Sequence, residues 1–156
     1  MISSQSFGSN DHRFILEWGG FDTDITETDC LLCAEYYKAK QKGWKLPQQI
    51  AVDDERNIYV VDTGNSRIQK FTNDGQFLSS WGTNGVENGE LQSPVGIAIY
   101  ENNVYLVDEE QSNVQKYDND GNFILKWGGQ GNENGQFHEP KGITIDSNGI
   151  VYVADS

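Results

Sequence analysis

The chain has 156 residues, about the length of one domain, and carries 24 acidic and 11 basic residues for a net charge of −13. Such an acidic surface repels phosphate and argues against a nucleic-acid partner. No apolar run approaches the roughly 18 residues of a membrane span, so no membrane partner is expected.

Residues 1–19 are predicted to hold the terminal strands of an incomplete β-blade. The segment NDHRFILEW at residues 10–18 aligns with NDGNFILKW at residues 119–127, which closes a later repeat unit. A degenerate strand is expected before it. The start of the chain lacks the basic and apolar stretches of a signal peptide. Localisation therefore stays open between the cytoplasm and, for an N-terminally truncated sequence, secretion.

Residues 20–46 are predicted to be a helical insertion between blades. From Trp18 to Pro47 the chain advances 29 residues, whereas from Trp81 to Pro94 it advances 13. Thr28 or Asp29 can cap a helix N-terminus by accepting a free backbone N–H. Lysines near residue 40 would lie at the negative end of the helix dipole.

Cys30 and Cys33 give this insertion its only reactive potential. Three readings fit the spacing of the two cysteines: simple thiols, a redox pair or disulfide, or half of a zinc site. No cofactor or complete metal site is predicted.

The first full blade is predicted at residues 47–82. Asp62 ends its second strand, and we expect its carboxylate to accept N–H groups of the turn at residues 63–66 and to meet Arg67. The two inner strands are apolar almost throughout, because neighbouring blades pack on both faces. The outer two are expected to alternate. The four strands are predicted at residues 49–53, 58–62, 67–71 and 77–81.

Residues 83–128 are predicted to form a linker and a second blade with strands starting at Gly96, Val104, Asn113 and Phe123. Here Glu109 and Glu110 follow the strand-ending aspartate, and Asn113 replaces the arginine of the first blade. This loop has lost a cation and gained two acids. It is therefore a candidate for binding, although drift of an exposed loop would produce the same change.

Residues 129–156 are predicted to form a linker and the first half of a further blade, with strands at 142–146 and 151–155. The expected fold is all-β: a β-propeller of four-stranded antiparallel blades, because a repeat of 46 or 47 residues built from four strands is typical of propellers. Two, four, four and two strands make twelve, or three blades, half of a six-bladed ring. Either the sequence is part of a longer protein or two copies form a homodimer that completes the ring.

The recurring pattern resembles the NHL repeat. Its elements are a heading proline before G-I-A, then I-Y-V-V-D, then R-I-Q-K-F followed by D-G-x-F, then W-G. The resemblance covers about 130 residues by this pattern and implies a β-propeller, commonly of six blades.

We predict a non-catalytic scaffold that binds a protein, peptide or glycan partner through an acidic loop face. The alternative is a fragment of a propeller lyase or hydrolase whose catalytic residues lie on absent blades. The candidate contact residues are mostly glutamates on linkers and loops: Glu87, Glu90, Glu109, Glu110, Asn113, Glu133 and Glu139.

Overall fold

The structure, a computed structural model, describes residues 2–6, 13–18 and 43–156, with side chains described from residue 43 onward. It divides into two compact units, Met1–Trp44 and Lys45–Ser156. The predicted helix and both cysteines, Cys30 and Cys33, lie outside the described residues. Residues 43–46, at the end of the predicted insertion, are irregular or bent.

The first unit contains one antiparallel strand pair, β1 (Ile2–Ser6) and β2 (Arg13–Trp18). Ile2 lies opposite Trp18 and Ser6 lies opposite Arg13, and the register shifts between Ser3 and Gln5. The two strands that the sequence predicts for residues 1–19 are therefore present.

The second unit begins with a four-stranded antiparallel sheet in which the strands follow chain order. A short 3₁₀ turn, η1 (Thr63–Asn65), links its second and third strands. The first strand starts two residues before the predicted position, at the heading proline. The strands are β3 (Pro47–Val52), β4 (Ile58–Asp62), β5 (Arg67–Phe71) and β6 (Phe77–Trp81).

A second sheet repeats the same order, from its first strand at the inside to its fourth at the outside. Its first two strands are joined by a two-residue turn in which Glu101 and Asn102 have φ of 46° and 60°. Positive φ at both positions is the geometry of a type I′ hairpin, which matches the twist of the strands. The strands are β7 (Pro94–Tyr100), β8 (Asn103–Asp108), β9 (Asn113–Asp118) and β10 (Phe123–Gly128).

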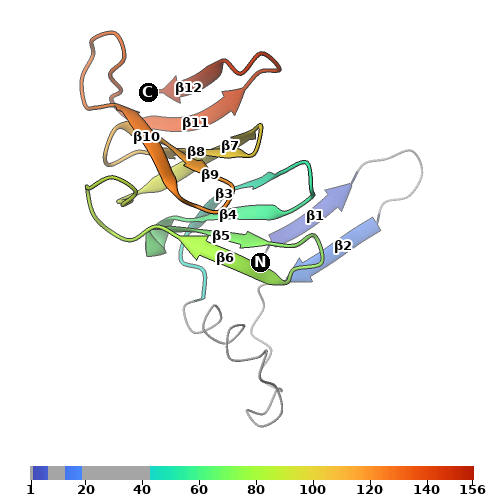
Figure 1. The fold of residues 1–156 in the computed structure, drawn as a ribbon. Helices are drawn as coiled ribbons and strands as arrows, with labels where there is room; N and C mark the ends of the chain where they lie inside the picture. The colour runs from blue at the N-terminus through green and yellow to red at the C-terminus, as the bar shows by residue number, and fades with distance from the viewer. Residues whose placement is uncertain (1, 7–12, 19–42) are drawn as a thin grey trace. The chain divides into compact units, whose positions relative to one another are not determined.

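The last two strands, β11 (Pro140–Ile145) and β12 (Val151–Asp155), form a two-stranded sheet. Pro140 pairs with Asp155 just as Pro94 pairs with Asp108. Figure 1 shows this pair, in red, following the two four-stranded sheets of the second unit. The twelve strands of the described residues group as two, four, four and two, as the sequence predicts. Among the described residues no helix is long and apolar enough to cross a membrane.

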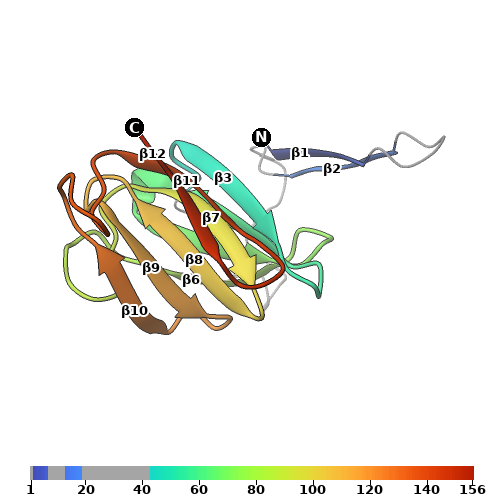
Figure 2. The same ribbon diagram turned by 90° about the horizontal axis from the view of Figure 1, so that it is seen from above.

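The sheets pack face to face through apolar side chains, with the innermost strands β3, β7 and β11 next to one another (Figure 2). Tyr59 and Val61 of the first sheet meet Ile97 and Leu106 of the second in one buried cluster. A second cluster joins the other face of the second sheet to β11 and β12. Each sheet therefore contributes half of an interface and has no core of its own.

The prediction that the third strand alternates between buried and exposed residues is wrong. β5 and β9 are buried along most of their length, and only the outermost strand β6 alternates regularly. The polar residues of the third strand do not face water. Gln69 is buried and donates to Asp62, and Gln115 is buried and donates to the carbonyl of Glu90 in the preceding linker.

Gly121 offers a direct test of sheet-to-sheet packing. Its φ is +87°, and an added Cβ would lie 2.6 Å from Cδ2 of Trp81 in the neighbouring sheet. Gly135 has nearly the same φ, +85°, with no atom within 4 Å of an added Cβ. Both alanine variants carry the backbone strain of about 1–2 kcal/mol, but only Gly121→Ala adds overpacking of roughly 1–3 kcal/mol.

Urea unfolding followed by tryptophan fluorescence, at one protein concentration, should show Gly121→Ala as clearly less stable than Gly135→Ala. Equal losses in the two variants would contradict the contact between Gly121 and Trp81.

Candidate functional site

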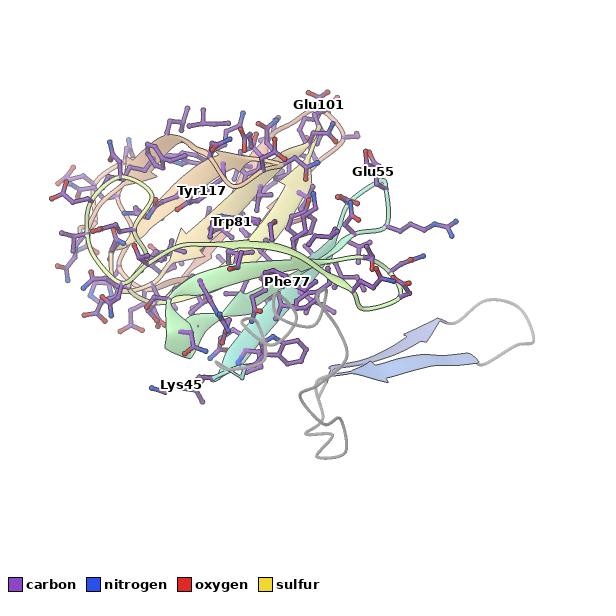
Figure 3. The ribbon with its side chains drawn as sticks, turned by 60° about the horizontal axis from the view of Figure 1, so that its bottom comes forward. Lys45, Glu55, Phe77, Trp81, Glu101 and Tyr117 are labelled. Atoms are coloured by element: carbon purple, nitrogen blue, oxygen red, sulfur yellow. The ribbon has the colours of Figure 1, made fainter. Side chains whose placement is uncertain are left out.

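The second unit has two ends with different chemistry. At the loop end lie the linkers 82–93 and 129–139 together with the loops 63–66 and 109–112 between second and third strands. At the turn end lie the tight turns that join the other strands. Figure 3 shows Glu55 and Glu101 on turns at one end and Lys45 at the opposite end.

At the loop end of the first sheet, a buried carboxylate organises the loop. Asp62 pairs with Arg67 at 2.7 Å and accepts hydrogen bonds from the side-chain amides of Asn65 and Gln69. It also accepts the backbone N–H of Lys45 at 2.8 Å. The predicted meeting with Arg67 is confirmed.

The predicted bonds from the turn's own N–H groups to Asp62 are wrong, since this aspartate makes no side-chain cap of the 3₁₀ turn. The N–H of Gly64 donates to the carbonyl of Lys45, and that of Ser66 donates to Thr63. The reason is that this carboxylate accepts the backbone N–H of Lys45, in the linker before β3. The sequence pattern did not include that linker.

Asp108 holds the equivalent position in the second sheet, but with neutral donors. It accepts the backbone N–H groups of Gln92, Ser93 and Gln111, at distances from 2.7 to 3.1 Å. The side-chain amide of Gln111 also donates to it, at 3.3 Å. Gln111 additionally bonds carbonyls of the linker. Its side-chain amide therefore serves Asp108 as that of Asn65 serves Asp62, and no guanidinium takes part.

The candidate residues of the linkers lie in two turns built alike. The carboxylate of Glu90 accepts the N–H of Glu87 at 3.0 Å. In the next linker, the amide oxygen of Gln136 accepts the N–H of Glu133 at 3.0 Å. Both leading glutamates are exposed, so Glu87 and Glu133 place carboxylates in solvent at equivalent points of successive linkers.

Glu109 and Glu139 are brought together by Lys141. Its Nζ lies 3.2 Å from Glu109 Oε1 and 3.9 Å from Glu139 Oε2. Glu110, beside them in the loop, is exposed. Two glutamates from successive repeat units therefore share one basic residue, and the exposed Glu110 beside Glu109 makes this patch acidic. In the sequence, the one signal for Lys141 is its position directly after the heading proline Pro140.

Asn113 is the one candidate that does not reach the surface, since its side chain is buried. Its Nδ2 donates to Gln111 Oε1 at 3.2 Å, and its Oδ1 has no hydrogen-bond partner among the described residues. Its position is that of Arg67 in the first sheet. Its hydrogen bond to Gln111 connects it to the loop that carries Glu109 and Glu110.

At the turn end, the aspartates serve their own turns. Asp118 accepts the side-chain amide and the N–H of Asn122, and these bonds hold the pKa of its carboxyl below the ordinary value. The N–H of Ile150 does the same for Asp146 and lowers its pKa. These carboxylates are engaged by hydrogen bonds within their turns, which is a structural role.

A polar network also crosses between sheets at the turn end. Buried Lys70 donates to Asn119 Oδ1 at 2.7 Å and lies 5.2 Å from the centre of the Tyr59 ring. The Tyr59 hydroxyl bonds both Asp53 and Asn119. Burial raises the pKa of Asp53, but hydrogen bonds from Asn57 and Tyr59 outweigh it and lower the pKa overall. Because its members are bonded to one another, this network joins two sheets.

No group of three or more potential metal-ligating side chains occurs among the residues that the structure describes. The predicted thiol, redox or zinc roles of Cys30 and Cys33 fall outside that part of the chain and stay predictions.

The sheets are built as β-propeller blades, and comparison with solved structures agrees. A streptogramin B lyase structure matches with a TM-score of 0.53 at 17% identity, over 73% of this chain and 37% of that one. A Bacteroides thetaiotaomicron protein of unknown function matches with a TM-score of 0.56 at 22% identity, over 74% and 36%. Virginiamycin B lyase from Staphylococcus aureus, in a structure of its catalytically inactive form with quinupristin, gives 0.54 at 14%, over 70% and 34%.

Residues 45–71, which include β4 and β5, match the family model of the NHL repeat, so the chain contains an NHL repeat within a propeller-type fold. No curated protein matches it. It spans between 34% and 37% of the length of these three solved structures.

The carboxylate of Asp62 can be tested by charge removal. Asp62→Asn keeps the shape of the side chain but removes the negative charge that faces the largely buried guanidinium of Arg67. Breaking a buried pair in this way should lower the free energy of unfolding by about 3 kcal/mol. Asp120→Asn, on an exposed turn, removes the same charge and should change it by less than about 0.5 kcal/mol. Urea unfolding distinguishes the two, and similar small losses would show that Asp62 does not hold the loop.

Proposed function

We propose that this protein is a non-catalytic NHL-repeat scaffold that binds a protein, peptide or glycan partner through the acidic surface of its loop end. The observation that carries the proposal is the pairing of Glu109 and Glu139 with the same Lys141, next to the exposed Glu110 of the same loop. One lysine against three carboxylates leaves an uncompensated negative charge. Charge complementarity therefore favours a partner segment rich in Lys or Arg.

The contrast between the two ends supports this choice. At the turn end, carboxylates such as Asp118 and Asp146 accept hydrogen bonds that fix their own turns. At the loop end, Gln111 satisfies the buried Asp108 with its amide. The acids at the loop surface are therefore not needed to hold the second blade together.

The test is binding of a fluorescein-labelled oligolysine peptide, measured by fluorescence anisotropy at low ionic strength. In the triple variant Glu109→Gln, Glu110→Gln and Glu139→Gln, three surface charges are lost. At about 0.5 kcal/mol each, affinity should fall roughly tenfold. Binding by the unsubstituted chain should weaken in about 1 M salt, where the Debye length is about 3 Å.

The matched control removes three exposed acids from the turn end: Asp54→Asn, Glu55→Gln and Glu101→Gln. Its net charge changes by the same amount, so its affinity should stay within about twofold if the loop end is the site. Equal weakening in both triple variants would show a nonspecific effect of net charge and would overturn the proposed surface.

A second candidate, a fragment of a propeller lyase, is favoured by the likeness to streptogramin B lyase and virginiamycin B lyase. That likeness shows the fold alone. Among the described residues His138 is the one histidine. Its contact with the loop is made by its backbone, whose N–H donates to the carboxylate of Asp155.

A turnover assay with quinupristin, followed by mass spectrometry, tests whether this chain is non-catalytic. A non-catalytic scaffold should leave the compound unchanged, with the same time course as buffer. Conversion that depends on the concentration of this chain would establish the lyase and contradict the scaffold.

A further inference from the structure

Asn113 leaves a buried polar atom of the second blade unsatisfied. In the strand register it lies opposite Asp108. The same position of the first blade, opposite Asp62, holds Arg67. The Asn113 residue is only 7% exposed, and its Oδ1 has no hydrogen-bond partner among the described residues. A buried acceptor without a donor is destabilising, and in a folded protein it calls for a physical reason.

The neighbouring side chain, Gln111, lies against more acceptors than it can serve. Its Nε2 lies 3.1 Å from the carbonyl oxygen of Gly85, 2.9 Å from that of Glu90 and 3.3 Å from Asp108 Oδ2. A primary amide has two N–H groups, so it can bond only two of these three acceptors at a time. Gln111 Oε1 in turn accepts the Nδ2 of Asn113 at 3.2 Å, so the two amides are adjacent. This place is therefore rich in acceptors and poor in donors.

The same loop carries negative charge. Glu109 and Glu110 directly precede Gln111, and Glu110 is exposed. Glu109 shares Lys141 with another glutamate, so that lysine does not neutralise the loop. The surplus of acceptors and the surplus of negative charge thus occur together at residues 108–113. Together they point to a cationic ligand with several N–H donors.

We propose that this place receives an arginine side chain of the basic partner, a recognition step that rests on the proposed function. A guanidinium is planar and always charged, and it carries five N–H donors in a fixed fork. An ammonium offers three donors from a single point. In the complex the half-buried Gln111 side chain turns aside. The guanidinium donates to Asn113 Oδ1 and to the acceptors that the Gln111 amide shares.

The buried carboxylate stays satisfied in this exchange. Asp108 keeps three backbone N–H donors at distances from 2.7 to 3.1 Å. It gives up only the longer 3.3 Å contact with the Gln111 amide. The first blade contains the same arrangement within the chain, because Arg67 Nε lies 2.7 Å from Asp62 Oδ2 and the Arg67 side chain is 13% exposed. The second blade therefore obtains from a partner the guanidinium that the first blade supplies itself.

The test compares two fluorescein-labelled peptides of equal length and charge, oligoarginine and oligolysine, by fluorescence anisotropy at low ionic strength. A guanidinium fills several acceptors at once, so oligoarginine should bind the unsubstituted chain about tenfold more tightly. In Asn113→Arg the chain's own guanidinium occupies the place. This variant should bind both peptides alike, within about twofold of the affinity of the unsubstituted chain for oligolysine.

Two further variants separate the site from net charge and from misfolding. Asn73→Arg makes the same substitution on an exposed turn at the turn end, and it should keep the tenfold preference. Asn113→Leu removes the acceptor without adding charge or much volume, and it should reduce the preference to about twofold. Urea unfolding checks that each variant is folded. Should Asn113→Arg not fold, Asn113→Leu decides.

The outcomes distinguish this proposal from the one on which it rests. Equal affinities of both peptides for the unsubstituted chain overturn the arginine site, and so does a tenfold preference that persists in the folded Asn113 variants. In both cases basic peptides still bind, and the acidic surface stands. Binding of neither peptide contradicts the proposed function and the arginine site with it.

Discussion

The packing of one blade face on the next is the interaction on which the rest of the structure depends. Trp81 lies between two tyrosines of adjacent blades, with ring centroids 6.1 Å from Tyr59 and 6.3 Å from Tyr117. The ring of Trp81 occupies the space that a side chain at Gly121 would need. A single blade buries neither face alone, so each blade is stable only between neighbours.

Much of the fold follows from short-range signals in the sequence. Runs such as residues 58–62, bounded by turn residues, give the strands, and the Asp-Gly pairs at residues 74–75 and 120–121 give the hairpins. The sequence pattern places the heading proline before the first strand of each blade. In the structure, β3, β7 and β11 each begin at this proline. A proline can be the first residue of a strand, since it has no N–H to give to the ladder.

The parts that could not be predicted depend on contacts between distant segments. Gln49 stands where the repeat pattern expects glycine, and its side chain accepts the N–H of Ile97 in the next blade at 2.7 Å. The burial of Gln69 depends on Asp62 at the end of the neighbouring strand. The acids around Lys141 come from segments 30 residues apart, and no local pattern joins them. Periodicity describes one strand at a time, so it does not reveal polar bonds between strands or between blades.

The second blade shows how the repeat can change its surface without losing its structure. In the first blade the buried aspartate has a charged partner, Arg67, and in the second it has backbone N–H groups and the amide of Gln111. Because neutral donors satisfy Asp108, the arginine position can become the buried Asn113, and the loop above it is free to carry glutamates.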